Sequence, residues 1–98
     1  MRYKIAYLPE ARSDTRQIRR YLDQYYQSTV MNFFDLLKES IGNLKTNPLM
    51  YERYERRPDY RRMVVGDYLV FYKVLEDKHR VEIHRILHSS RQIERYID

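Results

Sequence analysis

The strongest structural signal in the sequence is the segment Tyr60-Arg61-Arg62-Met63-Val64-Val65-Gly66-Asp67-Tyr68-Leu69-Val70-Phe71-Tyr72-Lys73-Val74. Both halves are rich in β-branched and aromatic residues, which favour strands, and two residues separate them. Glycine at the first position of such a connection is typical of a type II′ turn. The segment therefore predicts a hairpin with strands at 60–65 and 68–75. The second strand is apolar on both faces, which places it in the centre of a sheet.

The flanking sequence predicts one strand after the hairpin and a strand with two helices before it. Residues 2–8 alternate in character, and residues 80–87 are dense in β-branched side chains. Apolar residues recur at spacings of three and four over 10–27 and over 30–44, which indicates two amphipathic helices. Residues 49–59 follow no period, so we expect an irregular exposed loop there.

The order of these elements defines the expected fold. A serine at position 89 or 90 can cap a short last helix, so the order is strand, two helices, three strands and a helix. This is an α+β fold in which a small antiparallel sheet packs on two N-terminal helices. The length of 98 residues fits a single domain over residues 1–98. Two helices cover one face of such a sheet, so we expect the other face to be partly open and to carry the function.

The composition excludes several classes of protein. The chain has no cysteine, which excludes disulfides, thiol catalysis and thiolate zinc sites. Its apolar runs are far shorter than the roughly 20 residues that span a bilayer, so we expect a cytoplasmic protein without membrane contact. Glycine-rich phosphate loops and nucleophile elbows are absent from the sequence. His84 and His88 should lie on one strand face about 13 Å apart, too far to share a metal. We therefore expect neither a metal nor a cofactor.

The charge of the chain points to an anionic partner. The formal net charge is +5, and 14 of the 19 basic residues are arginine. Guanidinium groups bind phosphate or carboxylate through two parallel hydrogen bonds, so nucleic acid and an acidic protein segment are the candidate partners. Alternatively, the 14 acidic residues neutralise much of this charge locally.

Metal-independent cleavage of RNA is one activity that these side chains could support. It needs a base for the ribose 2′-hydroxyl, a cation beside the phosphorane and an acid for the 5′-oxygen. The candidate cations are Arg61, Arg62, Arg85 and Arg91, and the candidate acid is His88, whereas no residue stands out as the base.

Each of these candidates also has a structural interpretation. His88 at a strand end can be hydrogen-bonded to backbone, and Arg61 and Arg62 can form a solvated strand edge that discourages aggregation. Arg85 lies within a strand, where pairing with Glu82 or with a loop carboxylate is favoured over contact with a substrate.

The hairpin segment, followed by Arg85-Ile86-Leu87-His88-Ser89-Ser90-Arg91, resembles the RelE/ParE superfamily of bacterial toxins. The first strand and the two helices resemble the same superfamily, so the likeness covers essentially the whole chain. It implies a toxin of a type II toxin–antitoxin pair, held inactive by a cognate antitoxin encoded beside it. Such antitoxins are commonly acidic segments that fold on contact, so the resemblance implies that Arg61, Arg62, Arg85 and Arg91 bind the antitoxin or the target.

The resemblance leaves the target of the toxin open. RelE-like toxins cut messenger RNA on the ribosome, whereas ParE-like toxins poison DNA gyrase. RelE-like nucleases carry an arginine where this chain has Leu69, and the loss of such a charge-stabilising donor costs about 3–4 kcal/mol in a transition state. Over the full length the ParE-like comparison is somewhat closer, which favours gyrase. The alternatives are a ribosome-dependent endoribonuclease that uses His88, Arg91 and Arg61, and a decayed antitoxin-binding module without toxicity.

Overall fold

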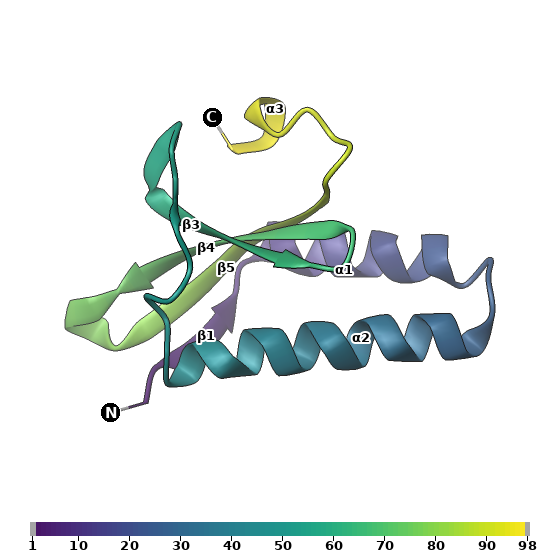
Figure 1. Ribbon diagram of the computed structural model, residues 1–98, viewed down its shortest axis with the longest axis horizontal. Coiled ribbons are helices and arrows are strands. Elements are labelled where there is room, and N and C mark those ends of the chain that lie inside the picture. Colours follow the sequence, from purple (N-terminus) through teal and green to yellow (C-terminus); the bar gives the residue numbers. More distant parts are fainter. Residues whose placement is uncertain (1, 98) are drawn as a thin grey trace.

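The computed structural model describes residues 2–97 and consists, over that range, of a five-stranded sheet with helices on both sides (Figure 1). The strands are β1 (Lys4–Tyr7), β2 (Arg53–Tyr54), β3 (Arg57–Val65), β4 (Tyr68–Leu75) and β5 (Arg80–His88). The helices are α1 (Pro9–Leu22), α2 (Gln27–Gly42) and α3 (Glu94–Ile97). This confirms the predicted α+β class and the predicted order of the main elements.

The strand order in the sheet is β1-β5-β4-β3-β2. Strands β2 to β5 pair antiparallel, as expected, whereas β1 lies parallel to β5 at one edge. Strand β2 falls within the segment 49–59 that we expected to be irregular throughout. It pairs with β3 through two residues and an irregular register, which is too short a strand to produce a periodic pattern.

The hairpin between β3 and β4 has the predicted two-residue turn. Val65 pairs with Tyr68, and Gly66 between them has a φ of 57°, a conformation that glycine adopts without steric cost. Asp67 does not share this positive φ, which distinguishes the turn from type I′ and agrees with type II′.

Helices α1 and α2 pack against one face of the sheet and form the main core with it. Pro9 begins α1 at a position where its missing N–H is not needed. The buried residues of α1 and α2 include Ala11, Ile18, Leu37 and Ile41, which meet Met63, Val70 and Tyr72 of the sheet. The Tyr72 hydroxyl donates to the Pro48 carbonyl at 2.8 Å, and burial raises the pKa of Tyr72 to about 12.

The opposite face of the sheet carries a second, smaller core. Phe71, Leu87 and Ile97 are buried there, and Ile93 packs against them. The chain after β5 returns over this face to α3, where Arg57 Nη1 donates to the Ile97 carbonyl at 2.9 Å (Figure 1). This face is therefore only partly open, because the C-terminal segment covers its centre while Arg62 and Val64 on β3 stay exposed.

No helix within residues 2–97 combines the length and the apolar character needed to cross a bilayer.

Candidate functional site

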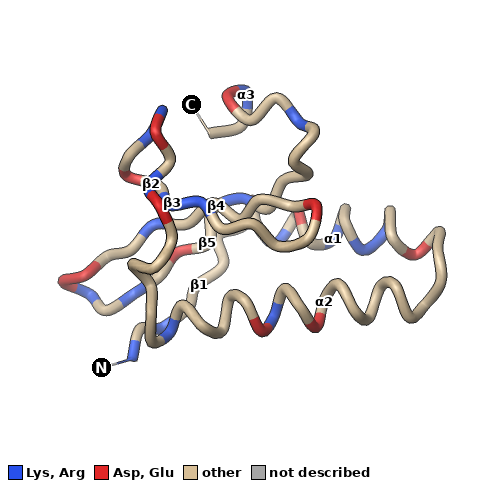
Figure 2. Tube along the Cα trace, viewed as in Figure 1, with Lys and Arg blue, Asp and Glu red and all other residues tan. Residues whose placement is uncertain are grey.

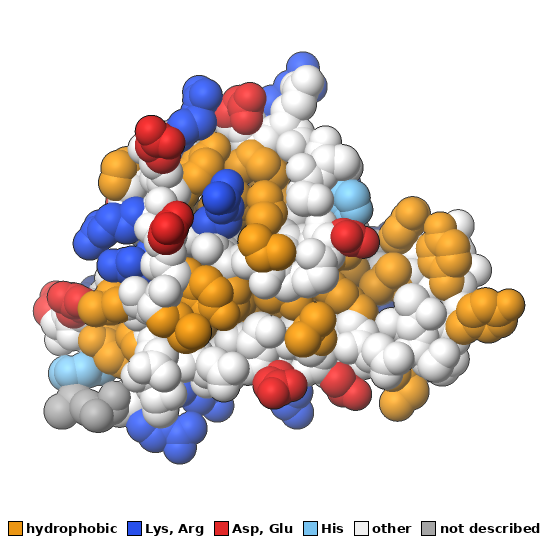
Figure 3. All heavy atoms as spheres, in the orientation of Figure 1, with side chains coloured by type: hydrophobic (Ala, Val, Ile, Leu, Met, Phe, Trp, Pro, Cys, Tyr) orange, Lys and Arg blue, Asp and Glu red, His pale blue; other side chains and the backbone are white. Residues whose placement is uncertain are grey.

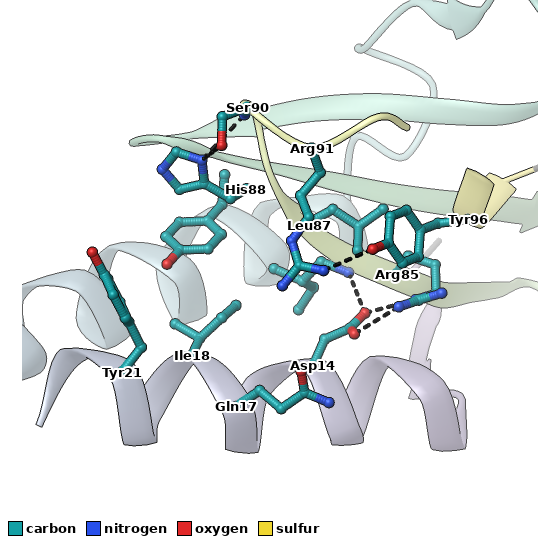
Figure 4. Close-up of a pocket in the computed structure, with 12 residues that line it drawn as sticks. Asp14, Gln17, Ile18, Tyr21, Arg85, Leu87, His88, Ser90, Arg91 and Tyr96 are labelled. Atoms are coloured by element: carbon teal, nitrogen blue, oxygen red, sulfur yellow. Dashed lines mark hydrogen bonds and ion pairs between the residues drawn. The ribbon is translucent and has the colours of Figure 1, made fainter. Parts of the chain in front are cut away.

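A pocket of about 500 Å³ lies where α1, the end of β5 and the C-terminal segment meet (Figure 4). Its walls contain charged, aromatic and apolar side chains, which are Asp14, Gln17, Ile18, Tyr21, Tyr68, Arg85, Ile86, Leu87, His88, Ser90, Arg91 and Tyr96. Three of the sequence-predicted site residues, Arg85, His88 and Arg91, line it together.

Asp14 lines the bottom of this pocket, and its carboxylate binds a backbone amide on the edge of β5 that no strand pairs with. The last bond of β1 to β5 is made by the Leu8 amide to the Ile83 carbonyl, and the chain then turns into α1. Beyond that point Asp14 Oδ2 accepts from the Ile86 amide at 2.9 Å, so a side chain replaces the missing neighbouring strand. Asp14 also binds Arg85 through both carboxylate oxygens, at 2.8 and 2.9 Å.

Arg85 is therefore paired with a carboxylate, as its position in a strand suggested, but the partner is Asp14. Glu82 instead contacts His84 at 3.3 Å and Arg80 at 3.3 Å. The hydrogen bonds to Asp14 raise the pKa of Arg85 further above its already high value, so this guanidinium stays charged. Nε and Nη2 of Arg85 already donate to Asp14, so most of the guanidinium edge that could bind an external anion is occupied within the protein.

Arg91 and Tyr96 form the exposed wall of the pocket. Arg91 Nη1 donates to the Tyr96 hydroxyl at 2.8 Å. The guanidinium carbons of Arg85 and Arg91 lie 5.2 and 5.5 Å from the centroid of the Tyr96 ring, within the range of cation–π attraction. One aromatic ring thus holds two like charges near each other, and Arg91 offers its remaining N–H groups to the pocket.

His88 lies at the mouth of the pocket with a defined tautomer. The Ser90 amide donates to His88 Nδ1 at 3.1 Å, and the Ser90 hydroxyl lies 2.7 Å from the same atom (Figure 4). Because Nδ1 accepts these bonds, the neutral ring carries its proton on Nε2. The ring also packs edge-on against Tyr68, with centroids 5.2 Å apart. The expected bond to backbone is therefore present.

Arg61 and Arg62 lie outside this pocket and on opposite faces of β3. Arg61 pairs with Tyr72 and shares the helix-covered face, where its Nη1 donates to the Tyr51 carbonyl at 2.7 Å. Arg62 is exposed and pairs with Phe71 on the other face. The structure does not bring Arg61 to His88 and Arg91, since it lies four residues, about 13 Å, along β3 from Val65, which is level with the β5 end.

A bulge in β5 corrects the predicted placement of the two strand histidines. Phe71 pairs with Arg85 and Tyr72 pairs with Ile83, which leaves His84 as an extra residue. The extra residue reverses the alternation of faces beyond it. His84 therefore contacts Tyr60 on the second-core face, at 3.4 Å, whereas His88 packs on Tyr68 of the main core, so the two histidines do not share a face. No group of three metal-ligating side chains occurs within residues 2–97.

Leu69 lies on the second-core face and packs beside Phe71 and Leu87. Its side chain adds apolar contact there and supplies no charge. The arginines proposed to bind a partner are also spread over several regions, since Arg85 and Arg91 line the pocket and Arg61 and Arg62 lie on opposite faces of β3. Figure 3 shows basic side chains distributed over the visible face rather than gathered in one patch.

Asp14 and Tyr68 are pocket residues that sequence reasoning missed. Asp14 is 71 positions from Arg85, and its place in an otherwise polar part of α1 carries no local signal of a buried partner. The sequence predicts Tyr68 as a strand residue and gives no sign that its ring lines a pocket. Burial raises the pKa of the Tyr68 hydroxyl, which keeps it protonated at neutral pH.

The sequence matches, over residues 5–93, the family model described as the ParE toxin of the type II toxin–antitoxin system parDE. The chain belongs to the ParE toxin family. This confirms the resemblance to the RelE/ParE superfamily and establishes the protein as a toxin of a type II toxin–antitoxin system at the level of that superfamily. A comparison with curated proteins found no match.

Solved structures of toxins share the ParE-family fold of this chain. The chromosomal ParDE system from P. aeruginosa superposes with a TM-score of 0.71 at 14% identity, covering 88% of this chain and 95% of that chain. The RelBE2 toxin–antitoxin complex from Mycobacterium tuberculosis gives 0.62 at 20% identity, covering 90% and 99%. The isolated E. coli RelE toxin gives 0.57 at 14% identity, covering 95% and 92%. Identities this low show a shared fold and no more.

Proposed function

We propose that this ParE-family toxin acts by binding DNA gyrase and stabilising its cleaved complex with DNA, and that a cognate antitoxin neutralises it. The observation that carries the choice of gyrase over RNA is the separation of the candidate nuclease residues. His88 and Arg91 line one pocket, whereas Arg61 is bound to backbone carbonyls on another part of the sheet. A ribonuclease needs these groups around a single phosphate.

The environment of the remaining charges supports the same conclusion. Arg85 is inside the pocket, but both of its bonded nitrogens face Asp14. The negative carboxylate beside it also opposes the approach of a phosphate. Leu69 provides an apolar contact where RelE-like nucleases carry an arginine. Of the pocket residues within 2–97, Arg91 is therefore the cation that keeps N–H groups for an anion without a carboxylate beside it.

A second candidate, ribosome-dependent cleavage of messenger RNA, is favoured by one specific observation. His88, Arg91 and Tyr96 line the same pocket, so an acid, a cation and a phenol are near one another. Cleavage by this set would have to proceed without a second cation at the phosphate, and the missing donor would cost about 3–4 kcal/mol.

The proposed antitoxin partner is supported by charge and by the structural relatives. The chain carries a net charge of +5, which attracts an acidic segment at long range. Two of the similar structures belong to toxin–antitoxin systems, RelBE2 and ParDE. The affinity for the product of the adjacent gene should weaken as salt is raised, because screening reduces the attraction between exposed charges. Salt-independent affinity would contradict the electrostatic part of this proposal.

Two parallel assays test the choice of target. Purified protein is added to gyrase with relaxed plasmid and, separately, to a translation extract with a defined messenger RNA. The proposal predicts loss of supercoiling and intact messenger RNA. Cleavage of messenger RNA in the ribosomal A site with normal supercoiling would establish the second candidate instead. Inactivity in both assays would identify the third alternative, a module that binds antitoxin without toxicity.

A further inference from the structure

Helix α1 segregates its charges between its two sides. Arg12, Arg16, Arg19 and Arg20 are all exposed, and at 3.6 residues per turn they fall within an arc of about 100°. The basic positions along α1 are visible in Figure 2. The exposed C-cap residue Asp23 follows Arg20 by three residues and Arg19 by four, so its carboxylate falls within the same arc. We call the four arginines the α1 basic stripe.

The acidic residues of α1 are turned away from this stripe. Asp14 is buried against β5 and binds Arg85, and a carboxylate oxygen of Glu10 lies 3.8 Å from the same guanidinium. Within residues 2–97 the side chains of Arg16 and Arg20 have neither a hydrogen bond nor an ion pair. The stripe is therefore a surface of net positive charge with the Asp23 carboxylate at one end, because Asp14 is buried and the exposed Glu10 lies on the other side of the helix.

Two of the four guanidinium groups are held in place before any partner arrives. Arg12 Nε donates to the Tyr7 carbonyl at 3.4 Å, and the Arg19 guanidinium carbon lies 4.9 Å from the centroid of the Phe34 ring. A guanidinium stacked on a ring keeps its N–H edge free for a bidentate bond, so little side-chain entropy is lost when an anion binds.

We propose that the α1 basic stripe binds the phosphate backbone of duplex DNA. Eight residues separate Arg12 from Arg20, which is about 12 Å along the helix axis. The DNA major groove is about 12 Å wide, so the two ends of the stripe can reach phosphates that border it on both sides. Contacts of this kind carry no base specificity and respond strongly to salt.

An acidic peptide is the competing occupant. A hollow of about 420 Å³ beside the stripe is lined in part by Tyr7, Phe34 and Leu37, which could take an apolar side chain. The Phe34 ring in it is already covered by Arg19, and the stripe extends past the hollow at both ends, to Arg12 and Arg20. A repeating polyanion uses all four arginines, whereas a peptide anchored in the hollow uses two.

The inference deepens the proposed function, since a toxin that holds DNA would be retained at the gyrase–DNA complex. Its test needs no gyrase, so failure here and failure of the gyrase proposal are separate results. The experiment measures the fluorescence anisotropy of a short labelled duplex with the purified toxin between about 50 and 200 mM salt. With four phosphate contacts, the slope of log affinity against log salt should be about −3.6.

The decisive variant is Arg16→Gln/Arg20→Gln, which removes the stripe arginines that make no hydrogen bond or ion pair with any residue the structure describes. The slope should become less steep by about 1.8, and at about 0.1 M salt the affinity should fall by about 60-fold. The matched control, Lys78→Gln/Arg95→Gln, removes the same charge from exposed positions outside α1 and α2 and should keep the wild-type slope.

Three results would overturn the proposal. One is absence of binding at about 50 mM salt, where contacts with phosphates are strong. Another is an equal loss of affinity in both double variants, because binding would then depend on net charge alone. The third is displacement of the duplex by an amphipathic Glu/Leu peptide that binds more tightly than the duplex, because the stripe would then be a peptide surface.

Discussion

Asp14 on α1 and Arg85 on β5 form a two-point ion pair, with Nε 2.8 Å from Oδ2 and Nη2 2.9 Å from Oδ1. The same Oδ2 accepts from the Ile86 amide, so one carboxylate satisfies a guanidinium and a free strand edge together. Asp14 is buried and Arg85 is mostly buried, which makes the pair insensitive to salt compared with a surface pair. The pair fixes the helix that carries the basic stripe to the strand that carries the pocket.

Asp14→Asn should therefore destabilise the protein strongly. The amide cannot neutralise Arg85, which would remain mostly buried with only the exposed Glu10 carboxylate 3.8 Å away, and breaking a buried pair in this way costs about 3 kcal/mol. Urea unfolding followed by circular dichroism measures the change in the free energy of unfolding.

A double-mutant cycle with Arg85→Met separates the pair from the other contacts of each residue. Asp14→Leu combined with Arg85→Met should lose much less stability than the sum of the single variants, since an apolar replacement of both partners leaves no unpaired charge. A coupling energy below about 0.5 kcal/mol would show that solvent screens the pair and would contradict its role in fixing α1.

The stability of the protein should fall as pH decreases below about 6.5, in part because of His84. Burial lowers the pKa of His84 and outweighs the opposing hydrogen bond to Glu82. The folded state therefore binds this proton less readily than the unfolded state, so the contribution is complete above the unfolded pKa and is lost as pH falls toward the folded pKa. The groups around the ring include Tyr60, Glu82 and Lys73.

The pH dependence is measured by urea unfolding at several pH values for the wild type and for His84→Gln. The variant should show a flatter profile between pH of about 5 and 6.5. An identical slope for the wild type and His84→Gln would rule out the buried neutral ring as the cause.

Gly42→Ala should stabilise the protein by about 0.4–1 kcal/mol. Gly42 ends α2 with φ −58° and ψ −33°, and an added Cβ there would meet no atom within 4 Å. Alanine adopts this conformation and loses less entropy on folding. The matched control is Gly66→Ala, which should destabilise by about 1 kcal/mol because φ is 57°. Thermal unfolding of the two variants and the wild type measures both changes in stability. Stabilisation by Gly66→Ala would contradict the turn assignment.

His88→Ala should leave growth arrest intact when the toxin is expressed without its antitoxin. On the gyrase account the ring only packs on Tyr68 and bonds Ser90, so its loss removes no chemical step. Growth curves after induction measure the effect, and circular dichroism verifies folding. If a folded His88→Ala and a folded Arg91→Ala were both harmless to cells, RNA cleavage by these residues would become the better explanation.

The fold was largely predictable where the signal is local. The hairpin follows from Gly66 between two β-rich runs, and the central strand follows from side chains that are apolar on both faces. The parallel pairing of β1 with β5 and the two-residue strand β2 leave no local trace, because both depend on contacts with distant segments. The packing of the C-terminal segment on the second face was not predictable for the same reason. The sequence around Ile93 and Ile97 indicates a short helix but does not indicate where that helix packs.

The site was less predictable than the fold. The composition indicates that arginines are the candidate binding residues. Which arginines share a pocket depends on the pairing register of the strands, which the sequence does not show. Alternation predicts that His84 and His88 share a face, and the bulge at His84 reverses this. The internal carboxylate of Arg85 could be expected, whereas its identity as Asp14 required the packing of α1 on β5.

The most direct test of the proposed target measures cleaved DNA rather than loss of activity. Gyrase, supercoiled plasmid and the purified toxin are incubated together and then treated with detergent and protease, which releases linear DNA from any stabilised cleavage complex. The account predicts that the wild-type toxin, with its natural Leu69 and Arg61, produces an amount of linear DNA that increases with toxin concentration. Plasmid that stays intact at every toxin concentration, while ribosome-bound messenger RNA is cut by the same preparation, would contradict it.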